Sequence, residues 1–322
     1  MIAPPRRVPQ PALRAAAYGQ SILERVGNTP LIAPQRVVPA NPSVQLLIKA
    51  EWFNPGGSVK DRAALQIVLD AERRGDLAGG KTLIDSSSGN TGIAYAMVGA
   101  ALGFPVELVM PASVSEERKL IAAGYGAKIT YSDPYEGSDG AIRLVRRVIA
   151  EQGERYYYAD QYSNPSNWQA HYQGSGPEIW RQTQGKITHF VAGLGTSGTI
   201  MGTGRYLREC NPQVQIVGVQ PDDALHGIEG LKHMESAIVP AIYDEHLLDQ
   251  KLLVNTEEAF DLTRRMAREE GIFAGGSSGA AMLGALRLAE TLDTGVIVVV
   301  FPDGGDKYLT TSLWKYDSDW SI

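Results

Sequence analysis

Lys60 is the residue with the clearest capacity for covalent chemistry in this sequence. It lies in residues 54–62 (NPGGSVKDR), hereafter the lysine segment, between a predicted strand and a predicted helix. The paired glycines permit a tight turn and Ser58 is a good helix N-cap, so Lys60 falls in the first helical turn. A charged amine is disfavoured there, because the helix N-terminus already carries partial positive charge. Lys60 is therefore neutral or bonded to another group, or it is a solvated surface lysine paired with Asp61.

Three other turns predicted between a strand and a helix carry groups that bind anions. Residues 85–92 (DSSSGNTG), hereafter the carboxylate turn, combine hydroxyls, an amide and free backbone N–H groups, which suit a carboxylate. Residues 193–199 (GLGTSGT), hereafter the phosphate turn, offer hydroxyls and backbone amides that suit a lone phosphate. A serine-rich turn at residues 274–280 opens another helix. The alternative for each is an ordinary capping turn.

The phosphate turn also matches the G-x-G-x-x-G pattern of dinucleotide-binding proteins. Dinucleotide binding needs a ribose-binding acid at the end of the next strand. Gln220 occupies that position, and the acid Asp222 lies two residues after it. A lone phosphate is therefore favoured. Together, the amine and the three turns predict a site for pyridoxal phosphate and an amino acid. An aldehyde cofactor also explains Lys60, because an imine needs no full ammonium beside the helix N-terminus.

The segments around these turns alternate between short apolar runs and longer amphipathic stretches, which predicts parallel sheets covered on both faces. So many strands favour two domains over one large sheet. The predicted fold class is α/β with two domains, each an open, mostly parallel twisted sheet with flanking helices. We expect an N-terminal arm at residues 1–17, a smaller domain at residues 46–160, and a larger cofactor-binding domain at residues 18–45 plus 161–322. Strands are predicted at residues 44–50, 82–84, 106–110, 127–131, 189–192, 214–219, 252–254 and 296–301.

The composition excludes several classes of function. The 322 residues carry a net charge of −6, which argues against non-specific nucleic-acid binding. No apolar run reaches the roughly 18 residues of a membrane span. Cys210 is the single cysteine, so neither an intrachain disulfide nor a cysteine-rich metal site is possible, and we expect no bound metal. The first twenty residues lack the apolar stretch of a secretory signal, so we expect a cytoplasmic enzyme without nucleic-acid or membrane partners.

Nearly the whole sequence resembles the cysteine synthases (O-acetylserine sulfhydrylases), fold-type II pyridoxal-phosphate enzymes with a tryptophan synthase β-like fold. The resemblance runs from residues 22–31 (ILERVGNTPL) to residues 302–309 (PDGGDKYL), and the lysine segment is its most specific motif. Residues 164–165, 171–172 and 176–180 are further landmarks. The resemblance implies a homodimer with small-molecule substrates. It also implies a β-replacement that forms L-cysteine from O-acetylserine or O-phosphoserine and sulfide or another sulfur donor, through an aminoacrylate intermediate.

The resemblance also assigns a role to each candidate residue. Lys60 would bind the cofactor covalently and later move the α-proton, Asn90 would contact the cofactor's ring oxygen, and Ser277 would face the pyridine nitrogen. A neutral serine there leaves that nitrogen unprotonated, which favours loss of a β-substituent. The phosphate would lie on Gly195, Thr196, Ser197, Gly198 and Thr199. The substrate would be held by Ser87, Ser88, Asn90, Thr91, Gln161, Gly230 and Lys232.

Residues 225–234 (LHGIEGLKHM), hereafter the entrance loop, depart from the common enzymes and resemble the cysteine synthase B branch. Some members of that branch prefer O-phosphoserine or thiosulfate, so Lys232 either meets such an extra anion or is a surface lysine. Ser87 and Ser197 also replace an expected threonine and an expected glycine. Three alternatives stay open: a β-replacement enzyme making diaminopropionate derivatives or cystathionine, a serine or threonine dehydratase, and a non-catalytic binding module.

Overall fold

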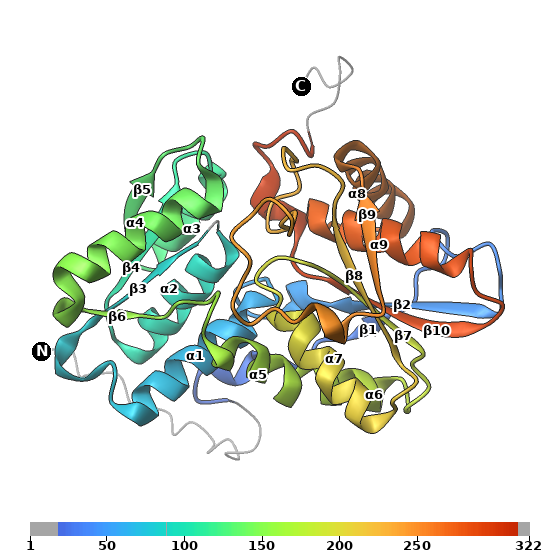
Figure 1. Cartoon of the computed structure of the whole chain (residues 1–322), viewed down its shortest axis with the longest axis horizontal. Helices are drawn as coiled ribbons and strands as arrows, with labels where there is room; N and C mark the ends of the chain where they lie inside the picture. Colours follow the sequence, from blue (N-terminus) through green and yellow to red (C-terminus); the bar gives the residue numbers. More distant parts are fainter. Residues whose placement is uncertain (1–18, 88, 315–322) are drawn as a thin grey trace, which may run out of the picture.

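The computed structural model describes residues 19–87 and 89–314, so the predicted N-terminal arm and Ser88 lie outside the described residues. Within the described residues, the strands form two sheets, one of six strands and one of four. Figure 1 shows the four-stranded sheet with its helices on the left and the six-stranded sheet with its helices on the right. The predicted fold class of two α/β domains is confirmed.

The smaller sheet has the order β5-β4-β3-β6 and is parallel throughout. Alternate residues of its central strands pack on opposite faces, so that Leu108 contacts one cluster of buried side chains and Val109 contacts another. Helices α1, α2 and α3 cover the first face, and α4 covers the second. The strands are β3 (Thr82–Ser86), β4 (Val106–Pro111), β5 (Lys128–Ser132) and β6 (Tyr156–Tyr158). The helices are α1 (Lys60–Arg74), α2 (Asn90–Leu102), α3 (Glu116–Gly124) and α4 (Gly137–Gln152).

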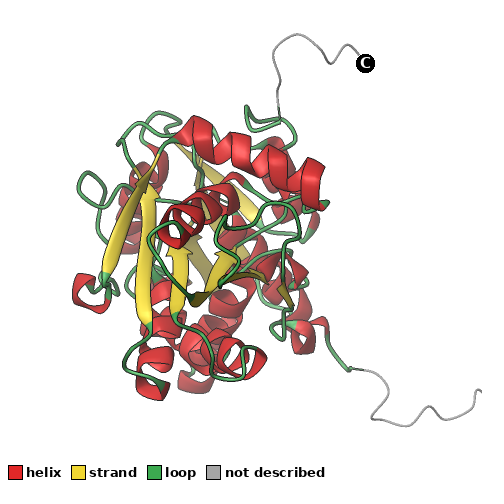
Figure 2. Cartoon of the chain, turned by 90° about the vertical axis from the view of Figure 1, so that its right-hand side faces the viewer, coloured by secondary structure: helices red, strands yellow, loops and turns green. Residues whose placement is uncertain are grey.

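The larger sheet has the order β1-β2-β10-β7-β8-β9, and only the β1–β2 pair among these neighbours is antiparallel. Both of its faces are covered by helices, as Figure 2 shows. The strands are β1 (Leu31–Ile32), β2 (Val44–Ala50), β7 (His189–Gly193), β8 (Gln215–Pro221), β9 (Gln250–Val254) and β10 (Gly295–Phe301). The helices are α5 (Pro165–Gln173), α6 (Ser175–Gln182), α7 (Gly198–Cys210), α8 (Thr256–Glu270) and α9 (Gly276–Ala289).

Strand β10 shows why the apolar run at residues 296–301 is continuous. Ile297, Val299 and Phe301 pack against helices α8 and α9, whereas Val298 and Val300 pack on the opposite face with residues of α6 and α7. A strand buried on both faces needs apolar residues at every position. The run therefore places β10 at the centre of the larger sheet, with its carboxyl end inside the molecule.

Two local predictions need correction. Strand β2 lies entirely in the larger sheet, beside β10, although the predicted limit at residue 46 assigned most of it to the smaller domain. The other domain limits stay a prediction. Val59, and not Ser58, precedes the first residue of α1, although Ser58 Oγ still accepts a hydrogen bond of 3.3 Å from the Lys60 amide. In the described ranges, no helix combines the length and apolar character that a membrane span needs.

Candidate functional site

A cavity of about 600 Å³ lies where turns that follow β3, β7 and β10 meet the entrance loop. Helix N-termini of α1, α2, α7 and α9 reach its wall, an arrangement expected at the carboxyl ends of parallel strands. The structure therefore brings most of the predicted site residues together. Those that line the cavity are Lys60, Asn90, Thr91, Gln161, Gly195, Thr196, Ser197, Thr199, Gly230, Lys232 and Ser277.

The turn before Lys60 is held by the segment that follows β10. The Val59 amide donates a hydrogen bond of 2.8 Å to the Pro302 carbonyl, and Ser58 pairs with Asp303 in an isolated β-bridge. Lys307 Nζ donates to the carbonyl oxygens of Gly56 and Gly57, each at 2.9 Å. The start of α1 is thereby fixed to the larger sheet, so the Lys60 side chain extends from a rigid position.

The Lys60 amine is available for bonding. Burial lowers the pKa of Lys60, and the negative charge of Asp303 partly opposes this effect. Among the described residues, no group forms a hydrogen bond with Lys60 Nζ. The alternative of a solvated lysine paired with Asp61 is wrong, because Asp61 is fully buried and its carboxylate accepts a hydrogen bond from the Gly56 amide. A lysine that is readily neutral can attack an aldehyde.

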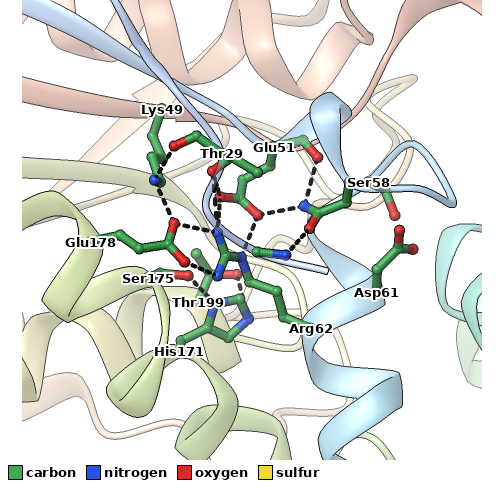
Figure 3. A network of polar contacts seen from close by, with 12 residues as sticks. Thr29, Lys49, Glu51, Ser58, Asp61, Arg62, His171, Ser175, Glu178 and Thr199 are labelled. Atoms are coloured by element: carbon green, nitrogen blue, oxygen red, sulfur yellow. Dashed lines mark hydrogen bonds and ion pairs between the residues drawn. The ribbon is translucent and has the colours of Figure 1, made fainter. Parts of the chain in front are cut away.

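A buried ionic network holds α1 in place through Arg62, two residues after Lys60 (Figure 3). Arg62 contacts Glu51 and Glu178 at 2.7 Å each, and Lys49 also lies 2.7 Å from Glu178. Two cations and two anions balance each other in this network, and Thr29 Oγ1 donates to Glu51 at 2.7 Å. Each charged group thus keeps partners after it leaves water, as buried ions require.

The carboxylate turn follows β3 and begins α2. Thr91 Oγ1 donates a hydrogen bond of 2.7 Å to Gln161 Oε1, and Gln161 Nε2 donates to the Ser86 carbonyl at 2.5 Å. Thr91 and Gln161 both line the cavity, as predicted. Ser87 is not among the lining residues: its buried Oγ accepts hydrogen bonds from the amides of Gly89 and Gly92, at 3.1 and 2.8 Å. Ser87 therefore stabilises the turn itself, and its contact with the substrate stays a prediction.

The phosphate turn follows β7 and begins α7. Ser197 has a left-handed backbone with φ of 71°, which favours glycine and explains why glycine is expected there. Its buried Oγ has no hydrogen-bond partner among the described residues. A Cβ added at Gly195 would lie 2.2 Å from the Gly230 carbonyl oxygen. The turn therefore has a hydroxyl without a hydrogen-bond partner at Ser197. It also approaches the Gly230 backbone so closely that only glycine fits at position 195.

Three predicted members of the phosphate turn contact helix α5. Gly198 is not among the lining residues, and a Cβ there would lie 1.9 Å from Asn167 Oδ1. Asn167 Nδ2 also donates to Thr196 Oγ1 at 3.2 Å. Thr199 Oγ1 lies 3.4 Å from His171 Nε2, and burial lowers the pKa of His171 to about 3, so this imidazole is neutral at pH 7. Gly198 thus allows the close packing that positions its neighbours.

These residues fit pyridoxal phosphate. One cavity is lined by Lys60, whose amine has no hydrogen bond, by the phosphate turn with the unsatisfied Ser197 hydroxyl, and by Ser277 at the N-terminus of α9. Asn90 Oδ1 is also buried without a partner among the described residues. The amine would hold the aldehyde, the phosphate turn would hold the phosphate, and helix N-termini would stabilise its charge.

The sequence analysis identified Lys232 but not the other charged residues close to it around the cavity. Lys232 is buried and pairs with Asp139 of α4 at 2.8 Å, so it is not a surface lysine. Arg118 of α3 contacts Glu229 of the entrance loop and lies 3.9 Å from Asp303. For Asp303, the available signal was an acid two residues after the last apolar strand. Arg118 and Asp139 had no such signal, since both lie in ordinary helical stretches.

Comparisons with known proteins identify the family to which this chain belongs. A family model described as pyridoxal-phosphate dependent enzyme matches residues 22–303. A cysteine synthase of Aquifex aeolicus is 56% identical over 302 residues, which cover 92% of each chain. Cysteine synthase B of Pseudomonas aeruginosa is 46% identical over 91% of this chain and 97% of its own. A crystal structure of cysteine synthase from Entamoeba histolytica has a TM-score of 0.88 and 34% identity, covering 100% of this chain and 95% of that chain. The chain therefore belongs to the pyridoxal-phosphate-dependent enzymes, within the cysteine synthase family, and is an enzyme of cysteine synthesis that uses pyridoxal phosphate.

Proposed function

We propose that this chain replaces the β-substituent of an O-activated serine with a sulfur nucleophile and so releases L-cysteine. The observation that carries the proposal is the single cavity that joins Lys60 with the carboxylate turn and the phosphate turn. This cavity offers groups for an aldehyde, a phosphate and an amino-acid carboxylate at the same time. A β-replacement needs all three.

Each residue of the cavity has a task in this proposal. Bound pyridoxal phosphate supplies an electron-withdrawing ring that stabilises negative charge at the α-carbon of the amino acid. Thr91 and Gln161 orient the substrate carboxylate, and the amides at the start of α2 add partial positive charge. Lys60 Nζ removes the α-proton and later returns it, which requires a neutral amine for part of the cycle. The lowered pKa of Lys60, caused by burial, supports that requirement.

The charges near the entrance loop favour O-acetylserine over O-phosphoserine. In the part of the chain that the structure describes, the cations Lys232 and Arg118 line this side of the cavity, and each is paired with a carboxylate, Asp139 or Glu229. A phosphate group would have to displace a carboxylate and would then lie beside it, which costs electrostatic free energy. An acetyl group is neutral and meets no such penalty. Lys232 stays the residue that an anionic leaving group would meet if Asp139 moved away.

The proposal is tested with purified protein loaded with pyridoxal phosphate. We expect cysteine to form from O-acetylserine and sulfide, with a larger kcat/KM than from O-phosphoserine. Release of pyruvate without cysteine would instead indicate the dehydratase alternative. Formation of a different β-substituted alanine, at a rate far above that of cysteine, would indicate another β-replacement enzyme of the same fold.

We also propose that the chain acts as a cytoplasmic homodimer, with small molecules as its substrates. The family resemblance supports both parts of this proposal. Sedimentation equilibrium of the purified protein measures the assembly directly. A mass equal to one chain across the micromolar range would contradict the dimer.

A further inference from the structure

Asp303 is a buried acid at the carboxyl end of the larger sheet, two residues after β10. Its side chain is 0% exposed. Its Oδ2 accepts hydrogen bonds from Asn90 Nδ2 and from the Tyr308 hydroxyl, both at 2.6 Å. Arg118 Nη2 lies 3.9 Å from the same oxygen. A buried carboxylate needs such partners, because its removal from water carries a large desolvation cost.

The fold fixes the orientation of this carboxylate. A Cβ added at Gly275 would lie 2.2 Å from Asp303 Oδ1, so only glycine leaves room for the acid. Tyr308, from the short helix at Gly305–Tyr308, holds the other oxygen through its hydroxyl. Arg118 lies over the Tyr308 ring, 4.3 Å from its centroid. Asp303 is therefore held from the larger domain and from α3 of the smaller one.

Asp303 determines which end of the Asn90 amide faces it. A carboxylate only accepts hydrogen bonds, so the nitrogen of Asn90, and not its oxygen, must point toward Asp303. Because the amide group is planar, this hydrogen bond also fixes the direction of the second N–H of Asn90. Asn90 Oδ1 is left buried without a partner among the described residues. The direction in which Asn90 presents its amide to the cavity is thus set by Asp303.

Asp303 also acts on Lys60, through its charge and through the backbone beside it. The backbone around it pairs with the residues directly before Lys60, through the Ser58–Asp303 bridge and the Val59–Pro302 hydrogen bond of 2.8 Å. The negative charge of Asp303 favours the ammonium form of Lys60, whereas burial favours the neutral form and lowers its pKa. Among the described residues, Arg118 and Lys307 are cations close to Asp303, and Glu229 pairs with Arg118.

We propose that Asp303 is a positioning residue for the reaction. It orients the Asn90 amide toward the cofactor ring and places a fixed negative charge against the Lys60 amine. The charge keeps Lys60 able to hold the proton that it takes from the substrate. The inference concerns Lys60 and Asn90 in the resting protein, so it holds for any leaving group and its test is independent of the substrate.

The test measures the protonation of Lys60 in the full-length chain after removal of pyridoxal phosphate. Lys60 is labelled by reductive methylation across a pH series, and mass spectrometry of its peptide gives the midpoint pH of reactivity. Asp303→Asn removes the charge but keeps an acceptor for Asn90 and Tyr308. We expect its midpoint to fall by about one pH unit, because the ammonium loses its stabilising anion. Tyr308→Phe is the matched control, since it removes a hydrogen bond to Asp303 and leaves the charge. Return of the visible absorption band after the cofactor is added back shows that each variant is folded.

A second variant changes the charge in the opposite sense. Arg118→Gln removes the cation that offsets Asp303, so the Lys60 midpoint should rise, and this result is measurable even if Asp303→Asn does not fold. Equal midpoints in the parent protein and Asp303→Asn would overturn the proposal. So would equal shifts in Asp303→Asn and Tyr308→Phe, or, if Asp303→Asn does not fold, an unchanged midpoint in Arg118→Gln.

Discussion

The Lys232 ammonium lies 2.8 Å from the Asp139 carboxylate, and this ion pair joins the entrance loop to helix α4 of the smaller domain. Lys232 is also 5.3 Å from the centroid of the Tyr162 ring. The side chain is therefore held between two elements at the cavity wall. Its charge is neutralised by Asp139 as long as the pair is intact.

Asp139→Asn should raise the preference for O-phosphoserine, because it frees the Lys232 charge for the phosphate. We expect the ratio of kcat/KM for O-phosphoserine to that for O-acetylserine to increase about tenfold. Lys232→Met should lower the same ratio below that of the parent. The two ratios are measured by cysteine formation at fixed sulfide and fixed ionic strength. Changes in the same direction for both variants would contradict this account of the pair.

Lys60→Ala should lower kcat by at least about a thousandfold, because both the covalent attachment and the proton transfer are lost. Borohydride reduction followed by peptide mass spectrometry should find the cofactor on Lys60 in the parent protein. Lys186→Ala, at an exposed lysine, is the control and should retain full activity. Cofactor attached to another lysine in the parent protein would refute the assignment.

Gly195→Ala should weaken the binding of pyridoxal phosphate roughly tenfold or more, since the added methyl meets the Gly230 carbonyl at 2.2 Å. Titration of the visible absorption band measures this affinity. Gly124→Ala is a matched control, because a Cβ at Gly124 meets nothing within 4 Å and its φ is not positive. Equal affinities for the two variants would show that cofactor binding does not need the close approach of the phosphate turn to the entrance loop.

Ser197→Gly should change stability and cofactor affinity in opposite directions. Glycine relieves the left-handed backbone at φ of 71°, which should stabilise the cofactor-free protein by about 1 kcal/mol. The loss of the Ser197 hydroxyl should weaken cofactor binding, because one donor to the phosphate is removed. Urea unfolding of the cofactor-free chain and a cofactor titration give the two quantities. Unchanged cofactor affinity would exclude Ser197 from phosphate binding.

Glu178 should make the free energy of unfolding depend on pH in the acid range. Burial alone would raise the pKa of Glu178, but hydrogen bonds and charges from Arg62, with Lys49, lower it to about 2. Because this pKa lies below the value of about 4.3 in an unfolded chain, the stabilisation is complete above that value and is lost as pH falls toward 2. Measured between pH 7 and pH 3, the free energy of unfolding should fall in the parent protein.

Glu178→Gln should remove this contribution of Glu178 and destabilise the protein at pH 7 by about 3 kcal/mol, since Arg62 and Lys49 lose a buried anion. Glu116→Gln is the control, because the Glu116 side chain is 67% exposed, so water weakens its pair with Lys119 at 2.7 Å and the pair contributes little. An equal loss of unfolding free energy in both variants would show that the buried network contributes no more than a surface ion pair.

The sequence by itself determined the α/β class and the positions of the main functional turns. Glycine pairs, hydroxyl residues and apolar runs act locally: they decide where a strand ends and a helix begins. Lys60, Asn90 and Ser277 could therefore be placed at helix starts without any knowledge of their neighbours in space. Parallel strands then require that such turns gather at one edge of a sheet.

Only the tertiary structure decided which charges meet across the cavity. Asn90 and Asp303 are 213 positions apart in the chain, and Arg118 and Glu229 are 111 apart, so no local pattern relates them. The same holds for strand β2, whose apolar residues suit either sheet and whose place beside β10 depends on the packing of both. Contacts of this kind follow from how whole domains pack against each other. These contacts also show that Lys232 is buried in an ion pair and is not a surface lysine.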